Sequence, residues 1–128
     1  PDGDVSIAIA VLDPDSGVDA LMGIGGAPEG VITAAAVLCQ GGEMQARLKF
    51  QSDEQKERAK KMVDGDVDRV FHTTDLARGG VIFVATGVTS GDLLKGVRYS
   101  RNASMTESIV MNSSSGTVRR IETVHLAR

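Results

Sequence analysis

The chain has 128 residues, with 41% hydrophobic residues, 24% charged residues and a formal net charge of −3. This length suits one domain with its own core, and the slight acidity gives no electrostatic basis for binding nucleic acid. No apolar run approaches the roughly 20 residues of a membrane span, and the single cysteine, Cys39, excludes an internal disulfide and suits a reducing cytoplasm.

The first 40 residues predict two apolar helices separated by a short strand. Asp4 is a suitable N-cap for the apolar segment 5–12, which ends at an Asp/Pro/Gly-rich turn. Residues 20–24 predict a short buried strand. Residues 28–40 predict a nearly all-apolar helix, because Pro28 suits a first helical turn and two glycines follow the last helical residue.

The middle of the chain predicts short strands alternating with helices. Apolar and polar residues alternate over 44–50, which favours a half-buried strand. Ser52 is the expected N-cap of a charged helix at 53–63, whose acidic residues come early and basic residues late. Residues 70–72 predict a short strand, and 74–75 a turn into a brief helix.

The last part of the chain predicts strands. The continuous apolar run 81–86, bounded by glycines, predicts a central strand buried on both faces. Residues 104–111 and 117–126 flank a polar loop and predict a β-hairpin, whose imperfect alternation favours a bulge. With βα units first and antiparallel strands last, the expected fold is α/β, a layered αβ sandwich with a mixed sheet.

The glycine-rich stretch 25–30 is the leading candidate for a functional site. It brings the carboxylate of Glu29 to the start of a helix, directly after a predicted strand. Ligands of open α/β sheets bind at such strand ends, and Mg²⁺ or Mn²⁺ takes one or two protein carboxylates together with substrate phosphate and water. The alternative is that Glu29 only complements the helix dipole.

Two other glycine-containing segments are weaker candidates. Asp2, Gly3 and Asp4 place two carboxylates before a helix, where they could accept hydrogen bonds from sugar hydroxyls or bind a metal. Asp4 is also explained by capping alone. The loop 87–92 offers hydroxyl and N–H groups to a phosphate, or is a plain turn in which Asp92 caps the following residues.

A dinucleotide site is the main alternative chemistry. The loop from Gly23 to Pro28 has two glycines at the spacing of the dinucleotide fingerprint, but Pro28 occupies the position of the third. A third possibility is a non-catalytic α/β interaction domain. Arg119 and Arg120 alternate across the last predicted strand, so at most one of them faces any given site.

Four segments occur in one order along the chain, at 2–5, 25–31, 85–94 and 117–122. Together they resemble the GlpX-type class II fructose-1,6-bisphosphatases, including the related bifunctional fructose-1,6-/sedoheptulose-1,7-bisphosphatases. The resemblance runs across essentially the whole chain. It implies a fold like that of the metal-dependent, lithium-sensitive carbohydrate phosphatases, in which layers of helices and sheets alternate.

The resemblance also implies an activity and a set of site residues. Members of this family hydrolyse the 1-phosphate of fructose 1,6-bisphosphate in gluconeogenesis, and the expected cofactor is a divalent metal, Mn²⁺ or Mg²⁺. By position, Glu29 matches a metal ligand, Asp2, Gly3 and Asp4 match the sugar-binding segment, and Gly26 matches a backbone contact to substrate. The expected enzyme is cytoplasmic, is a homo-oligomer (dimer or tetramer) and binds neither nucleic acid nor membrane.

Family members of this kind are much longer than 128 residues. Residues 1–128 are therefore expected to be the C-terminal α/β domain of a longer sugar phosphatase, and the missing part would carry most metal ligands and the basic residues for the second phosphate. This segment alone is predicted to be inactive.

Overall fold

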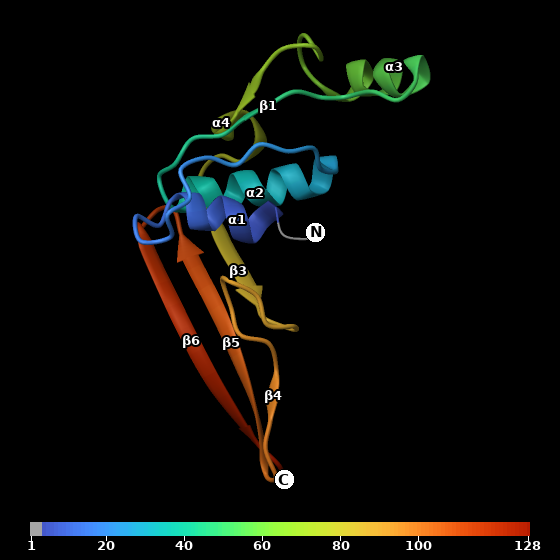
Figure 1. Cartoon of the computed structure of the whole chain (residues 1–128). Coiled ribbons are helices and arrows are strands. Elements are labelled where there is room, and N and C mark those ends of the chain that lie inside the picture. The colour runs from blue at the N-terminus through green and yellow to red at the C-terminus, as the bar shows by residue number, and fades with distance from the viewer. Residues whose placement is uncertain (1–3) are drawn as a thin grey trace.

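The computed structural model describes residues 4–128 (Figure 1). Its helices are α1 (Asp4–Val11), α2 (Ala27–Cys39), α3 (Asp53–Met62) and α4 (Thr73–Leu76). Its strands are β1 (Gln45–Ala46), β2 (Phe71–His72), β3 (Ile82–Thr86), β4 (Arg98–Tyr99), β5 (Ala103–Asn112) and β6 (Thr117–Leu126). Among residues 4–128, no helix combines the length and the apolar character that crossing a membrane requires.

The main sheet is built around β5. On one side, β3 pairs with the second half of β5 and β4 pairs with its beginning; on the other side, β6 pairs with the full length of β5. Every one of these pairings is antiparallel. A separate two-stranded antiparallel sheet joins β1 and β2. The parallel neighbours that a mixed sheet requires are thus not found within residues 4–128.

The helices α1 and α2 form a layer against one face of this sheet, next to β3 and the upper half of β5 (Figure 1). Between the two layers lies a core of mainly aliphatic side chains with one aromatic ring, that of Phe83: Ile9, Ala36, Cys39, Phe83, Leu94, Ile109 and Met111. The layered α/β class is confirmed.

The cysteine belongs to this core. Cys39 is buried, and its Sγ lies 3.5 Å from the carbonyl oxygen of Val81 and 3.7 Å from that of Met111. The structure therefore places it as a small buried side chain between α2 and the sheet.

Several predicted elements are confirmed. The second helix, the brief helix α4 and the short strand β2 lie where the sequence placed them, within one or two residues. Ser52 caps α3 as expected, because its Oγ accepts a hydrogen bond from the backbone N–H of Gln55 (3.3 Å). The hairpin is also confirmed, although β6 pairs with β5 over ten consecutive positions and the expected bulge is absent from it.

The prediction for residues 20–24 is wrong. This segment has no strand structure, and the side chains of Met22 and Ile24 are exposed. A five-residue apolar run forms a strand only where a neighbour accepts its hydrogen bonds, and no strand of residues 4–128 pairs with it. The strand predicted for 44–50 is likewise reduced to the two residues of β1.

The prediction for β3 is half right. A strand forms, but it lies at the edge of the sheet rather than in the centre. Phe83 is buried against the helices, whereas Ile82 and Val84 on the opposite face are 65% and 61% exposed. Within residues 4–128, no helix covers the face that carries Ile82 and Val84, so the strand is not buried between two helix layers there.

Candidate functional site

The site begins at the first turn of α2, where the backbone is set by its own sequence. Gly26 is the N-cap residue, with extended backbone angles (φ −69°, ψ 156°), and its carbonyl accepts the N–H of Gly30 at 3.0 Å. Pro28 sits in the first turn, where its missing N–H costs no hydrogen bond. Glu29 is the acidic residue of this turn.

The side chain of Glu29 is exposed and folds back over Gly26. A Cβ atom built on Gly26 would overlap Oε2 of Glu29, so glycine leaves the room that the carboxylate occupies. Within residues 4–128, Glu29 makes neither a hydrogen bond nor an ion pair with another side chain. Its carboxylate thus lies near the positive end of the helix dipole with its oxygen atoms free for a cation.

The predicted sugar-binding residues are only partly within the described part of the chain. Asp2 and Gly3 lie outside the described residues, as does the side chain of Asp4, whose backbone begins α1. The helices α1 and α2 pack against each other and both begin on the right of Figure 1. Asp4 and Glu29 therefore start neighbouring helices at the same end of the molecule.

The described residues do not assemble a complete metal centre. Within residues 4–128 there is no group of three or more His, Cys, Asp or Glu side chains that could hold an ion. Glu29 is consequently a single candidate ligand, and its partners would have to come from outside this range.

The loop after β3, which was a weaker candidate for phosphate binding, closes on itself. The Oγ of Ser90 accepts the N–H of Gly96 at 2.9 Å, and the N–H of Val97 donates to the carbonyl of Val88 at 3.1 Å. No helix follows Asp92, so the capping role considered for it is not found. Because these groups bind one another, the structure favours the plain-turn interpretation of this loop.

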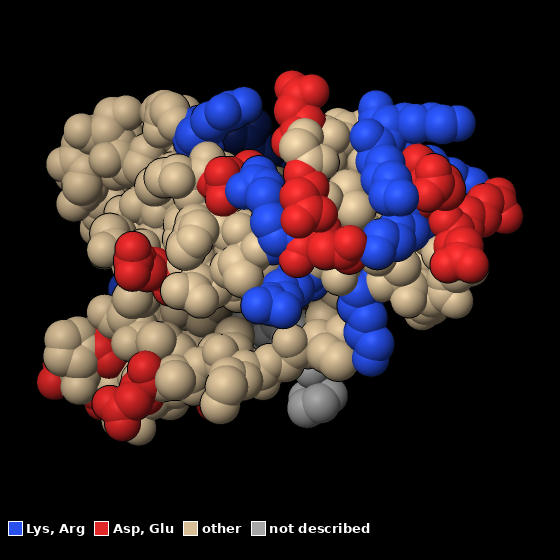
Figure 2. Space-filling model, turned by 90° about the horizontal axis from the view of Figure 1, so that it is seen from above, with Lys and Arg blue, Asp and Glu red and all other residues tan. Residues whose placement is uncertain are grey.

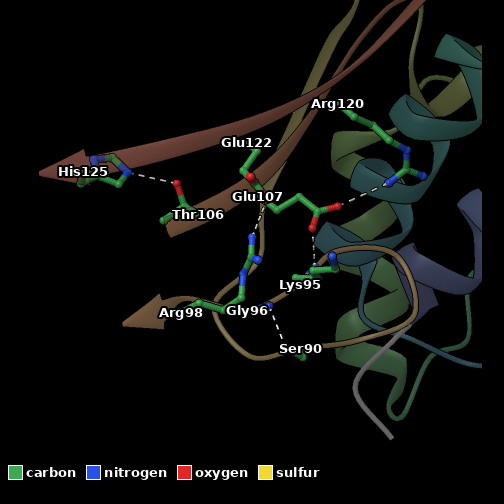
Figure 3. Close-up of polar contacts among 9 residues, drawn as sticks. All are labelled: Ser90, Lys95, Gly96, Arg98, Thr106, Glu107, Arg120, Glu122 and His125. Atoms are coloured by element: carbon green, nitrogen blue, oxygen red, sulfur yellow. Dashed lines mark hydrogen bonds and ion pairs between the residues drawn. The ribbon is translucent and has the colours of Figure 1, made fainter. Parts of the chain in front are cut away.

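A charged cluster beside this loop was not predicted from the sequence (Figure 3). One carboxylate oxygen of Glu107 accepts the backbone N–H of Lys95 at 3.3 Å, and the other lies 3.9 Å from Nη1 of Arg120. Arg120 also donates to the carbonyl of Leu93 at 3.0 Å. The strand register explains the cluster, since it pairs Arg120 with Ile109 on the face that the helices cover.

A second pair continues the cluster toward the tip of the sheet. Arg98 on β4 donates to Glu122 on β6 at 2.6 Å, and this hydrogen bond holds the pKa of the Glu122 carboxyl below its usual range. Thr106 and His125 share a hydrogen bond of 3.0 Å on the opposite face. Arg119 pairs with Val110, so the two adjacent arginines face opposite ways, as predicted.

A depression among the described residues lies elsewhere, at the start of α3. It is shallow, encloses ≈ 470 Å³ and is lined by Phe50, Gln51, Ser52, Asp53 and Lys56. Figure 2 shows acidic and basic side chains interspersed on the side of the molecule that carries α3. Neither Glu29 nor Gly26 lines this depression, so it is not the site considered above.

Comparison with known proteins places these features in context. The family described as bacterial, glpX-encoded fructose-1,6-bisphosphatase matches residues 1–125. A D-fructose 1,6-bisphosphatase class 2/sedoheptulose 1,7-bisphosphatase of Synechococcus sp. (strain JA-3-3Ab) is 41% identical over 138 aligned positions, which cover 98% of this chain and 40% of the relative. A fructose-1,6-bisphosphatase class 2 of Haemophilus influenzae is 42% identical, covering 98% of this chain and 41% of the relative.

These relatives are substantially longer than the present chain. The chain spans about two fifths of the length of the curated relatives it matches. Glu29, Gly26 and the segment 2–4 all lie within the matched range 1–125.

Proposed function

Because the chain belongs to the family of bacterial, glpX-encoded fructose-1,6-bisphosphatases, we propose that it is the C-terminal part of a sugar bisphosphatase. The reaction is hydrolysis of the 1-phosphate of fructose 1,6-bisphosphate, giving fructose 6-phosphate and inorganic phosphate. The observation that carries the proposal is the family match across 125 of the 128 residues.

In this proposal Glu29 is a ligand of a divalent cation, Mn²⁺ or Mg²⁺. The residue fits that role because its carboxylate is exposed, unpaired within residues 4–128 and fixed to the first turn of a well-packed helix. Hard divalent cations prefer carboxylate oxygens, and Glu29 supplies one such group. When bound, the cation neutralises charge on the transferring phosphoryl group and activates water for attack.

Asp2, Gly3 and Asp4 bind the sugar, and the backbone of Gly26 contacts it. Ionised carboxylates accept strong hydrogen bonds from hydroxyl groups, so two aspartates beside a glycine can orient the sugar ring. Asp4 and Glu29 start adjacent helices, an arrangement that suits a sugar held next to the cation. Gly26 suits a backbone contact because no side chain of its own would block the approach.

The dinucleotide alternative has lost its support. A fingerprint loop follows a strand and leads into a helix, but residues 20–24 form no strand. The family match also names a phosphatase.

The wider setting follows from the same proposal. We expect the complete enzyme to act in gluconeogenesis in the cytoplasm, as a homo-oligomer, without nucleic acid or membrane partners. Residues 1–128 alone should lack activity. In this proposal Glu29 is only one ligand of the metal site, and the other ligands lie in the additional part of the longer family members.

The test uses the complete enzyme, which contains residues 1–128 together with the part of the polypeptide that the longer family members have in addition. Glu29→Gln should lower Mn²⁺-dependent release of phosphate from fructose 1,6-bisphosphate at least about a hundredfold, since metal stabilisation of transition-state charge contributes several kcal/mol. The same substitution should weaken binding of Mn²⁺. Binding is measured through the electron paramagnetic resonance signal of free Mn²⁺, which decreases as the ion binds to the protein.

The matched control is Glu54→Gln. Glu54 also lies in the first turn of a helix and is exposed, but it pairs with Arg58 on α3. Its substitution should leave both readouts unchanged. Full activity and unchanged Mn²⁺ binding in the Glu29→Gln enzyme would remove Glu29 from the metal site.

A further inference from the structure

The loop 87–97, which joins β3 to β4, also supports the first helix. Its Leu94 is buried in the core described above, and Leu93 packs against that core. Val5 of α1 packs against the same core and directly follows Asp4, the first residue of the helix. The loop therefore supplies part of the apolar cluster against which the first turn of α1 packs.

The short helix α1 depends on such support. It has eight residues, whereas an isolated helix in water needs about 12–15 residues to be even marginally stable. Its position is consequently set by the groups that it packs against, which are α2 and the core cluster. A displacement of the loop would shift the start of α1, and with it the backbone of Asp4.

Glu107 on β5 holds this loop at both ends. Its backbone carbonyl accepts the N–H of Gly87 at 2.9 Å, and its carboxylate accepts the N–H of Lys95 at 3.3 Å. The two ends of the loop are close together, because a Cβ atom on Gly87 would overlap the carbonyl oxygen of Lys95. The side chain of Glu107 is only 19% exposed, so little water competes for its bond to Lys95.

Arg120 on β6 holds the backbone at the leucines. Its Nη1 donates to the carbonyl of Leu93 at 3.0 Å and lies 3.9 Å from Oε1 of Glu107. Figure 3 shows these two side chains directed toward each other beside the loop. Hydrogen bonds that involve a charged group are roughly twice as strong as neutral ones. The pair thus fixes the backbone of Leu93 and Lys95, on either side of the buried Leu94.

We propose that Glu107 and Arg120 are positioning residues for sugar binding. By fixing the backbone on both sides of Leu94, they set the position of the first turn of α1, where Asp4 begins the helix. The inference rests on the proposed function, in which the segment 2–4 binds the sugar. Neither residue needs to touch the substrate for this role.

The proposed metal ligand should not depend on this pair. Glu29 lies on α2, which has 13 residues, and several side chains in the second half of that helix are buried. The helix also packs against α4 and β3, which hold it independently of the loop. Loss of the pair should therefore weaken sugar binding and leave cation binding unchanged.

The test measures three quantities in the complete enzyme. Arg120→Met and Glu107→Gln keep the size of each side chain but remove its charge. Each should raise the KM for fructose 1,6-bisphosphate at least about fivefold, since a displacement of about 1 Å in a positioning group can cost up to about a hundredfold. The dissociation constant of fructose 6-phosphate, measured by calorimetry, should rise in parallel, whereas Mn²⁺ binding should be unchanged. Arg120→Lys should recover part of the affinity, because lysine can still donate to the carbonyl of Leu93.

The matched control is Glu122→Gln. Glu122 lies on the same strand and the same face as Arg120, but its ion pair is with Arg98 on β4. This variant should leave the KM and both binding constants unchanged. A merely structural role of the pair would lower the folded fraction, and hence the apparent kcat, without changing the KM. Circular dichroism measures that fraction in each variant.

The outcomes separate this inference from the function on which it rests. Unchanged KM and unchanged fructose 6-phosphate binding in both variants of an active enzyme would overturn the positioning role and leave the proposed function intact. Mn²⁺ binding weakened as much as sugar binding would also overturn it, because the disturbance would then be general. A complete enzyme that releases no phosphate from fructose 1,6-bisphosphate would overturn the proposed function itself, and the inference with it.

Discussion

The substitution Gly96→Ala tests the structure of the closed loop between β3 and β4. A Cβ atom at Gly96 would lie 2.6 Å from the backbone nitrogen of Ser90, 2.7 Å from the carbonyl carbon of Thr89 and 2.8 Å from the carbonyl oxygen of Val88. These are backbone atoms, which cannot rotate away as the end of a side chain does. The loop must open, and the bonds from Gly96 to Ser90 and from Val97 to Val88 lengthen.

The size of the effect follows from those contacts. Overpacking costs about 1–3 kcal/mol, and each of the two weakened hydrogen bonds about 0.5–1.5 kcal/mol, so the free energy of unfolding should fall by about 2–6 kcal/mol. Gly91→Ala in the same loop is the matched control, because its Cβ would meet nothing within 4 Å and neither glycine has a left-handed backbone. Urea unfolding followed by circular dichroism measures both. Equal midpoints for the two variants would refute the loop geometry.

Two further predictions concern the core and the first turn of α4. Met111→Ala should lower the free energy of unfolding by about 2–5 kcal/mol because the side chain is fully buried, whereas Met62→Ala, at an exposed position, should leave the urea midpoint unchanged. Asp75 accepts hydrogen bonds from the N–H of His72 and from Arg69, and the first of these contributes most to holding its pKa below the usual range. Its stabilisation is therefore complete above the unfolded pKa near 3.8 and is lost as the pH falls through the lower folded value. The gap in urea midpoint between the parent chain and Asp75→Asn should be constant near neutral pH and close below pH 4; a gap that widens on acidification would contradict this assignment.

Local sequence features predicted local structure well. The helix after the glycine stretch, the cap at Ser52 and the hairpin of β5 and β6 depend on residues that are near one another in the chain, and each is confirmed. The predicted strand at 20–24 was wrong because a strand requires a partner, and the sequence does not state which backbone supplies it. The edge position of β3 was missed for the same reason, since it depends on pairing with residues 108–112 of β5.

The charged cluster shows what strand register adds. Alternation along β6 predicted that Arg119 and Arg120 face opposite ways, which needs only the period of a strand. That Arg120 reaches Glu107 and the carbonyl of Leu93 depends on the pairing of β6 with β5 and on the path of the loop after β3. Such contacts join segments that are far apart in the sequence, so neither residue spacing nor composition could have predicted them.

The same distinction limits what the first turn of α2 can do alone. The position of Glu29 in the first turn of α2 is local and was predicted from the order of residues 25–30, whereas the fold of its side chain over Gly26 was not predicted. A divalent cation, however, takes about six oxygen ligands, and one carboxylate supplies at most two of them. Several other acidic residues of the described chain already have partners: Asp75 pairs with Arg69, Glu107 contacts Arg120 and the N–H of Lys95, and Glu54 and Glu57 pair with basic residues of α3. If Glu29 is a metal ligand, as proposed, the first turn of α2 is an incomplete site, because residues 4–128 hold no group of three or more side chains that could bind an ion with it.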